Sequence, residues 1–174
     1  MKLLSTDQKG SIAEMMIAAT AVKLDIDVYK PVNDGTRCDL ILDLDGRLTR
    51  IQCKWAACHG DVLIVRCYRN RRTRAGMLRR VYTADEVDAF AAYSLELDRC
   101  YFLPFASFPG QPNVYLRLAP TRNNQQRGIH WAEAYEFGAT IGRPGAVAQL
   151  GERSDGIRKV RGSIPLGSTQ QLFG

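Results

Sequence analysis

Apolar residues recur at three- and four-residue intervals near the start of the chain, and this spacing predicts an amphipathic helix over residues 7–24. Ser5, a residue type that favours the N-cap position, stands just ahead of it. The apolar stripe consists of Ile12, Met15, Met16, Ala19 and Val22. We expect this stripe to pack against other elements, and periodicity alone places Glu14, beside the stripe, in solvent.

Two alternating runs joined by a tight turn form the clearest pattern in the sequence. Residues 38–43 and 48–55 alternate between apolar and polar positions, and residues 44–47 between them contain the pair Asp45-Gly46. Asp-Gly flanked by alternating residues is among the strongest short-range signals of a β-hairpin. The pattern therefore predicts two antiparallel neighbouring strands.

Alternation separates polar from apolar side chains on both predicted strands. On the second strand Gln52 and Lys54 share a face, and on the first strand Asp39 lies opposite the apolar positions. The apolar positions that can fill a core are Leu40 and Leu42 on the first strand and Ile51, Cys53 and Trp55 on the second. A carboxylate, an amide and an ammonium group can therefore meet on one polar face, a grouping typical of a functional site.

Four further strands and two further helices are predicted. The strands are residues 27–30, 61–68, 100–103 and 114–118, the last of them an edge strand. Thr83 and Glu86 have the spacing of a capping box, which predicts a helix that buries Val87, Phe90 and Ala91. Residues 130–137 form a short helix candidate in which Trp131 and Tyr135 are expected to pack.

Length and composition describe an ordinary globular chain with one core. The chain has 174 residues, 45% of them hydrophobic, which favours a single domain plus an appendage. No apolar run approaches the roughly 18 to 20 residues that span a bilayer, and the N-terminus breaks off too soon for a signal peptide. We therefore expect a cytoplasmic protein with no membrane partner.

The cysteines are expected to be reduced thiols. There are five, an odd number without a Cys-x-x-Cys pair, which does not fit a disulfide framework or a zinc site. Cys58-His59 has the composition of half a zinc site, but no second pair has suitable spacing. Packed thiols are the favoured interpretation.

The positive charge is concentrated in one block. Formal net charge is +6, and no acidic residue occurs between Asp61 and Asp85. The block holds Arg66, Arg69, Arg71, Arg72, Arg74, Arg79 and Arg80. Such a block suits a phosphate backbone, where each neutralised charge releases counterions. We predict a basic loop that contacts DNA, and a solvated flexible loop is the alternative.

A second polar stretch, residues 120–127, is rich in side-chain amides. Arg122, Asn123 and Asn124 are residue types that pair bidentately with base edges. The same composition describes many exposed loops, so base reading and plain solvent exposure both stay open.

Residues 138–174 lack apolar periodicity and are rich in Gly, Ser, Arg and Pro, so we exclude them from the folded domain, residues 1–137. Residues 147–153 can be encoded by GTAGCTCAGCTGGGAGAGCG, which resembles the D arm of a bacterial transfer RNA gene. Residues 162–165 fit a T arm and residues 167–169 fit the end of such a gene, in the same order and at a suitable separation. We interpret the tail as read-through into a transfer RNA gene. An ordinary disordered tail is the alternative.

Three segments together resemble the PD-(D/E)XK nuclease superfamily, in particular its small homing-endonuclease-like branch associated with group I introns. The segments are Gly10-Ser-Ile-Ala-Glu14, Asp39-Leu-Ile-Leu and Gln52-Cys-Lys54, and the resemblance covers residues 8–137. It implies an α/β, restriction endonuclease-like fold, with a mixed central β-sheet flanked by α-helices. It also implies that the catalytic residues are Glu14, Asp39, Gln52 and Lys54.

The same resemblance implies a Mg²⁺ site, for which Mn²⁺ can substitute. The expected oxygen ligands are Asp39, the Gln52 side-chain carbonyl, the Cys53 backbone carbonyl and Glu14. A bound metal polarises the phosphate and acidifies a water molecule. Lys54 is expected to orient that water or to stabilise charge that develops on the phosphate.

The sequence departs from the family pattern at two positions. Cys38 stands where the family has a proline, and Gln52 replaces the usual second carboxylate, although the intron-associated branch also tolerates glutamine. An amide leaves less negative charge on the metal, so we expect weaker metal binding.

The expected function is hydrolysis of double-stranded DNA by a homing-type endonuclease that acts at or near a transfer RNA gene, in the nucleoid-associated cytoplasm of a bacterium. A duplex cut needs two active sites, so we expect a homodimer or a homotetramer. The DNA contacts are expected from Arg69, Arg71, Arg72, Arg74, Arg79, Arg122, Asn123 and Asn124. A Holliday-junction resolvase, a restriction-type nuclease and a catalytically inactive DNA-binding module are the alternatives.

Overall fold

The computed structural model describes residues 3–33, 35–74, 76–120 and 127–141, and for residues 71 and 72 it describes the strand without the side chains. The base-reading candidates Arg122, Asn123 and Asn124 therefore lie outside the described residues, as does the tail from residue 142 onward. None of the described helices is long and apolar enough to span a membrane.

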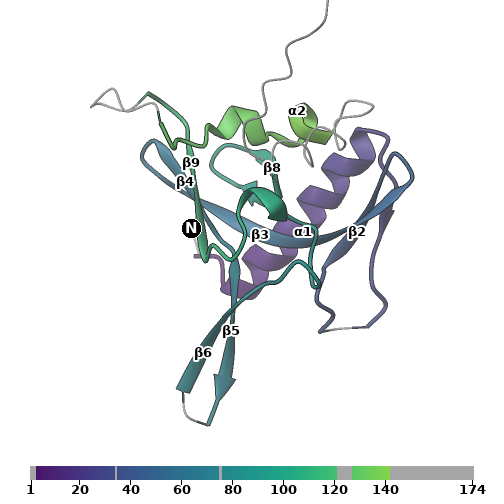
Figure 1. Ribbon diagram of the computed structural model, residues 1–174, viewed down its shortest axis with the longest axis vertical. Coiled ribbons are helices and arrows are strands. Elements are labelled where there is room, and N and C mark those ends of the chain that lie inside the picture. Colours follow the sequence, from purple (N-terminus) through teal and green to yellow (C-terminus); the bar gives the residue numbers. More distant parts are fainter. Residues whose placement is uncertain (1–2, 34, 75, 121–126, 142–174) are drawn as a thin grey trace, which may run out of the picture.

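A long central strand, β3 (Arg47–His59), organises the fold (Figure 1). It pairs antiparallel with β2 (Leu40–Leu44) and with β4 (Val62–Arg66). On the same strand, residues 51–55 pair in parallel with β7 (Ala89–Ser94). The predicted β2–β3 hairpin is confirmed, with Asp45 and Gly46 at its turn, both at positive φ.

Three outer strands complete a mixed sheet, which has seven strands within the described residues. The two-residue β1 (Val28–Tyr29) pairs with β2, β8 (Arg99–Pro104) pairs with β7, and β9 (Asn113–Arg117) pairs with β4 at the edge. All three were predicted as strands. The restriction endonuclease-like α/β architecture, a mixed sheet with helices against it, is confirmed.

Helix α1 (Thr6–Lys23) begins at a full capping box and lies across one face of the sheet (Figure 1). Ser5 Oγ accepts from the Gln8 backbone N–H at 3.2 Å, and Gln8 Oε1 accepts from the Ser5 backbone N–H at 2.9 Å. The buried line differs from the predicted stripe, because Met15 and Val22 are each 63% exposed. The fully buried residues are Ala13, Ile17 and Ala21, spaced four apart, and the two alanines suit close packing of the helix on the sheet.

Two core clusters lie on opposite faces of the sheet. The first joins α1 and α2 (Phe137–Ile141) to β2, β3 and β7. The second is covered by two short 3-10 helices, η1 (Phe105–Ser107) and η2 (Ala132–Tyr135). The helix predicted over residues 130–137 is thus η2 followed by α2, and α2 extends past residue 137 with Ile141 buried.

The helix predicted from Thr83 onward is wrong, because the chain enters β7 instead. The capping-box contact exists in part: Glu86 Oε2 accepts from the Thr83 backbone N–H at 3.2 Å. It closes a single turn. All six residues of β7 are buried, since the strand has a core cluster on each face, and such a continuous apolar run lacks the alternation that marks a strand.

The arginine block forms a hairpin, so the predicted loop is also wrong. Strand β5 (Tyr68–Thr73) pairs antiparallel with β6 (Gly76–Val81) as a separate two-stranded sheet, which projects away from the main sheet (Figure 1). We call β5 and β6 the arginine hairpin. Every described residue of β6 is exposed, so no buried face imposes the alternation of apolar residues that would have revealed a strand.

Candidate active site

The β2–β3 hairpin brings Asp39 and Gln52 into direct contact. Asp39, just ahead of β2, is fixed by its backbone N–H, which donates to the Ile51 carbonyl at 2.8 Å. Its Oδ2 accepts from Gln52 Nε2 and from the Cys53 backbone N–H, the latter at 2.8 Å. Strand alternation therefore places the carboxylate and the amide on the same polar face, as the sequence predicted.

Lys54 extends this polar face by one strand repeat. Its Nζ donates to the Tyr68 carbonyl and to the Tyr82 hydroxyl, both at 3.3 Å, and lies 4.7 Å from the centre of the Tyr82 ring. Burial lowers the pKa of Lys54, and the negative charge of Asp39 opposes that shift. The amine is thus held at the base of the arginine hairpin, within the electrostatic field of Asp39.

Glu14 approaches the same site from α1. Its side chain is 31% exposed, and Oε2 forms an ion pair with Lys30 Nζ at 3.1 Å. The hydrogen bond to Glu14 raises the pKa of Lys30. The sequence did not single out Lys30, because a contact across 16 residues between a helix and the end of a short strand leaves no local pattern.

The Asp39 carboxyl is electrostatically under-compensated. Its pKa is raised to about 6, mainly by burial and also by the negative charge of Glu14. The Cys53 backbone N–H and the charges of Lys54 and Lys30 act in the opposite direction without cancelling the burial effect. A cation beside Asp39 would offset this cost, since an opposite charge favours the ionised carboxylate.

The donor atoms fit a hard divalent cation. No group of three or more His, Cys, Asp or Glu side chains suited to a metal occurs in the part of the chain that the structure describes. Two carboxylates remain, Glu14 and Asp39, and Mg²⁺ is commonly held by one or two carboxylates with several waters retained. The donation from Gln52 Nε2 to Asp39 leaves the Gln52 carbonyl oxygen for another partner.

Cys53 contributes only its backbone to this site. Its thiol is buried in the core cluster beneath α1, and burial raises the pKa of that thiol. A protonated thiol is a poor ligand, and a hard cation prefers oxygen. The backbone carbonyl is therefore the one Cys53 group that suits the predicted metal site.

The predicted DNA-binding arginines differ in their surroundings. Arg74 and Arg79 are exposed, and the Arg79 guanidinium lies 4.2 Å from the centre of the Tyr68 ring. Arg69 is half-buried at the base of the hairpin, and the side chains of Arg71 and Arg72 lie outside the described atoms. The exposed arginines form the basic surface of the hairpin.

Arg80, which belongs to the same block, has a structural partner. Its guanidinium forms an ion pair with Glu86 at 2.8 Å, and Arg37 lies 3.3 Å from the same carboxylate oxygen. Glu86 is a buried acid, with 1% of its side chain exposed. This cluster joins the hairpin base to the segment that leads into Asp39.

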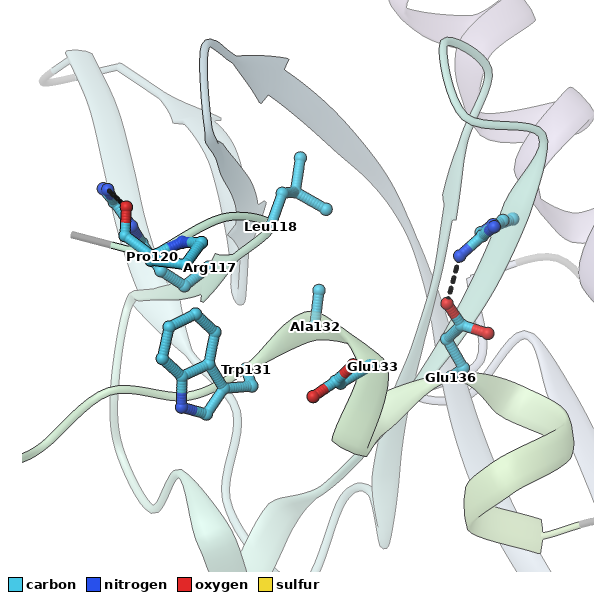
Figure 2. Close-up of a pocket in the computed structure, with 8 residues that line it drawn as sticks. Arg117, Leu118, Pro120, Trp131, Ala132, Glu133 and Glu136 are labelled. Atoms are coloured by element: carbon cyan, nitrogen blue, oxygen red, sulfur yellow. Dashed lines mark hydrogen bonds and ion pairs between the residues drawn. The ribbon is translucent and has the colours of Figure 1, made fainter. Parts of the chain in front are cut away.

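A separate cavity of about 430 Å³ lies between the end of β9, η2 and the start of β8 (Figure 2). Arg117, which lines it, donates to the carbonyl of Ala119 at 3.1 Å, and Arg99 forms an ion pair with Glu136. Its arginines are therefore engaged by the protein itself. None of the predicted catalytic residues lines this cavity.

A model of the PD-(D/E)XK endonuclease family matches residues 4–138. Among solved structures, the bacterial homing endonuclease I-Ssp6803I is similar, with a TM-score of 0.66 and 25% sequence identity, over 88% of this chain and 100% of that chain. No curated protein matches. The range matched by the family model contains Glu14, Asp39, Gln52 and Lys54.

Proposed function

Because this chain belongs to the PD-(D/E)XK endonuclease family, we propose that it hydrolyses phosphodiester bonds of double-stranded DNA with the help of a divalent metal ion. The observation that carries the proposal is the shared polar face of Asp39, Gln52 and Lys54, in which the first two are hydrogen-bonded and the third lies one strand repeat away. Glu14 adds a second carboxylate from α1, close enough to raise the pKa of Asp39.

Mg²⁺ is the metal that this donor set fits best, and Mn²⁺ can replace it. Asp39, the carbonyl oxygen of Gln52, the Cys53 backbone carbonyl and Glu14, directly or through water, would hold it. When bound, the ion supplies a Lewis acid for the phosphate and an acidified water as nucleophile.

The protein's own groups orient the reaction. The Asp39 carboxylate is fixed on two donors, so its position is set before the substrate arrives. Lys54 presents N–H donors on the same face, where they can hold the attacking water or stabilise charge that develops on the phosphate. The lowered pKa of Lys54 also brings its amine closer to a role in proton transfer.

The arginine hairpin is the element that we assign to the DNA backbone. Its strands project from the sheet next to Lys54, and Arg74 and Arg79 expose their charges to solvent. Arginine contacts to phosphates supply affinity that depends on salt and little on sequence. The hairpin would thereby hold the duplex with a scissile phosphate at Lys54 and Asp39.

The homing-type assignment rests on similarity and on the tail. A solved structure that is similar to 88% of this chain is a homing endonuclease. Residues 147–153, 162–165 and 167–169 can be encoded by codons that resemble parts of a transfer RNA gene, so we propose a target at or near such a gene. Cleavage of both strands requires two copies, in a homodimer or a homotetramer that works on the bacterial nucleoid.

One observation favours a second candidate, a DNA-binding module without catalysis. Gln52 occupies the position at which the family usually has a carboxylate. The absence of that charge weakens metal binding. If metal binding were lost altogether, the protein would still bind DNA but would not cleave it.

Nicking of supercoiled plasmid in Mg²⁺, in Mn²⁺ and in EDTA separates the two candidates. The endonuclease proposal expects metal-dependent nicking by the wild type and none by Asp39→Asn, with equal DNA binding by both. Binding without nicking in either metal would favour the inactive module. Cleavage of an uninterrupted transfer RNA gene, compared with scrambled DNA of equal length, tests the target, and equal cleavage of both would refute the homing assignment.

A further inference from the structure

We propose that Tyr82 is a positioning residue for Lys54, and that it ties the lysine amine to the base of the arginine hairpin. The proposal rests on the catalytic role proposed for Lys54. It adds a residue from outside the β2–β3 hairpin to the active site, and it joins the DNA-binding element to the catalytic one.

Both partners of the amine lie at the base of the arginine hairpin. Tyr68, whose carbonyl accepts from Lys54 Nζ at 3.3 Å, is the first residue of β5. Tyr82, whose hydroxyl lies at the same distance, directly follows Val81, the last residue of β6 and the partner of Tyr68 in the strand pairing. The amine therefore bridges the first residue of β5 and the residue that follows β6, where the hairpin leaves the sheet.

Tyr82 is rigid enough to act as a fixed partner. It is 6% exposed, and its ring packs edge-on against Phe90 at a centroid distance of 5.6 Å. Phe90 is buried in β7, where it pairs with Gln52. Tyr82 is thus held against the strand that pairs with β3 at Gln52, and the position of its hydroxyl sets the orientation of the Lys54 amine.

Two kinds of contact act between Tyr82 and Lys54. The hydroxyl accepts a hydrogen bond from the ammonium group, and the ring face attracts the same positive charge at 4.7 Å. Burial raises the pKa of Tyr82 to about 12, so the hydroxyl stays neutral at physiological pH and does not form an ion pair with the lysine. Phenylalanine would keep the ring contact and the packing but lose the hydrogen bond.

The hairpin base has a second connection to the site. Arg80 on β6 and Arg37 share the buried carboxylate of Glu86, and Arg37 lies two residues before Asp39. The base of the hairpin therefore contacts Lys54 directly, and through Glu86 it is linked to the segment that leads to Asp39. Duplex DNA on the hairpin would press on an element that contacts Lys54 directly and the segment before Asp39 through Glu86.

The first test is single-turnover cleavage by Tyr82→Phe. We expect the rate to fall about tenfold, which corresponds to the loss of one hydrogen bond to a charged group. DNA affinity should stay at the wild-type value, because the ring remains, and the rate is measured at a temperature at which the variant is folded. A purely structural tyrosine would be replaced by phenylalanine without a change in rate, so wild-type cleavage by this variant overturns the proposal.

Tyr101→Phe is the matched control. Tyr101 lies in the same core cluster as Tyr82, and its buried hydroxyl has no hydrogen-bond partner among the described residues. Removing it takes the same atom from the same side of the sheet without touching Lys54. We expect wild-type cleavage. An equal drop in rate for Tyr101→Phe and Tyr82→Phe would show that loss of any core hydroxyl slows the enzyme, and would overturn the assignment.

The second test does not depend on cleavage. Acetylation of Lys54 by an amine-reactive acetyl ester, followed by mass spectrometry, should be at least about threefold faster in Tyr82→Phe than in the wild type, because the amine loses one of its partners. An unchanged rate overturns the proposal. If the wild type fails to cleave any DNA, the endonuclease proposal fails, and the acetylation rate still decides whether Tyr82 holds the lysine.

Discussion

Asp39 and Glu86 are two carboxylates within one small region, and the protein treats them in opposite ways. Glu86 accepts from Arg80 at 2.8 Å and from the Thr83 backbone N–H at 3.2 Å, and it forms an ion pair with Arg37 at 3.3 Å. Among the described residues, Asp39 accepts only from neutral donors, the Gln52 amide and a backbone N–H. The buried Glu86 is thus matched by two cationic groups, while the half-buried Asp39 lies near cations without an ion pair to any described residue.

The difference is the one expected between a structural acid, Glu86, and the proposed metal ligand, Asp39. A buried charge with ionic partners stabilises the arrangement around it, and its removal leaves those partners uncompensated. A buried charge without an ionic partner costs free energy, which here raises the pKa of Asp39 to about 6. Proteins retain such an unfavourable charge where it binds a ligand. The ligand that fits oxygen donors of this kind is a divalent cation.

Replacing a carboxylate by the corresponding amide should therefore slow cleavage far more at Asp39 than at Glu86. Asp39→Asn removes the proposed metal ligand, and we expect the rate of cleavage to fall by about a thousandfold or more. Glu86→Gln, assayed at a temperature at which it is folded, should stay within about tenfold of the wild type. Single-turnover cleavage of plasmid in Mg²⁺ measures both, and comparable losses would erase the distinction between the two acids.

For stability, the order of the two substitutions should reverse. Glu86→Gln leaves Arg80 and Arg37 without an anionic partner, and we expect the free energy of unfolding at pH 8 to fall by about 2 kcal/mol. This value allows for the two arginine side chains, which are 48% and 61% exposed and can regain water. Urea unfolding monitored by tryptophan fluorescence provides the measurement. A change below about 0.5 kcal/mol would mean that the cluster is merely a surface ion pair.

Asp39→Asn, in contrast, should stabilise the metal-free protein. The asparagine carbonyl can still accept from its two donors, and the buried charge disappears. In EDTA at pH 8 we expect a gain of about 1 kcal/mol in the free energy of unfolding, after discounting the pKa shift for partial exposure of the carboxyl. Unfolding of both proteins in parallel gives the difference, and a loss of stability would show that the Asp39 charge is compensated after all.

The pH dependence fixes the sign of this effect. The pKa of Asp39 in the fold, about 6, is higher than its ordinary value of 3.8, so the folded state binds the proton more tightly than the unfolded state. The penalty is therefore full above pH 6 and is relieved as the pH falls from 6 towards 4. The advantage of Asp39→Asn should shrink over that window, and an advantage that is constant between pH 8 and pH 4 would point to a cause other than charge.

Sequence patterns revealed the part of the site that one buried face specifies. In the β2–β3 hairpin, Ile51 and Cys53 face a core cluster, so apolar and polar residues alternate visibly along the sequence. The positions of Asp39, Gln52 and Lys54 followed from this alternation. Alternation did not reveal the strands that lack a single buried face. Strand β7 is buried on both faces and resembles a buried helix, and the arginine hairpin has no buried face at all.

Long-range partners were missed for a different reason. Tyr82 reaches Lys54 across 28 residues, and Lys30 reaches Glu14 across 16, so neither contact leaves a repeat that a window of sequence can show. The Glu86 cluster was half visible: its spacing from Thr83 indicated the turn, but the two arginines that pair with it come from the hairpin and from the segment before β2. Side-chain roles that depend on three segments emerge only from the fold.

The distinction between compensated and uncompensated charges extends to the hairpin, where it predicts the smallest effect. Arg80 is paired with Glu86, whereas Arg74 is exposed at the hairpin turn. We expect Arg74→Ala to weaken DNA binding about threefold and to reduce the slope of log affinity against log salt concentration by about 1, since one phosphate contact is lost.

Arg80→Ala should leave that salt slope within error of the wild type and lower stability instead, because its charge already belongs to Glu86. Lys23→Ala, at the last residue of α1, removes the same charge from an exposed site whose helix end lies far from the hairpin in Figure 1, and should change neither quantity. Fluorescence anisotropy with a labelled duplex at four salt concentrations compares the three variants. Equal slopes for Arg74→Ala and Lys23→Ala would mean that the hairpin binds no phosphate at its turn, and that the DNA lies on another surface of the protein.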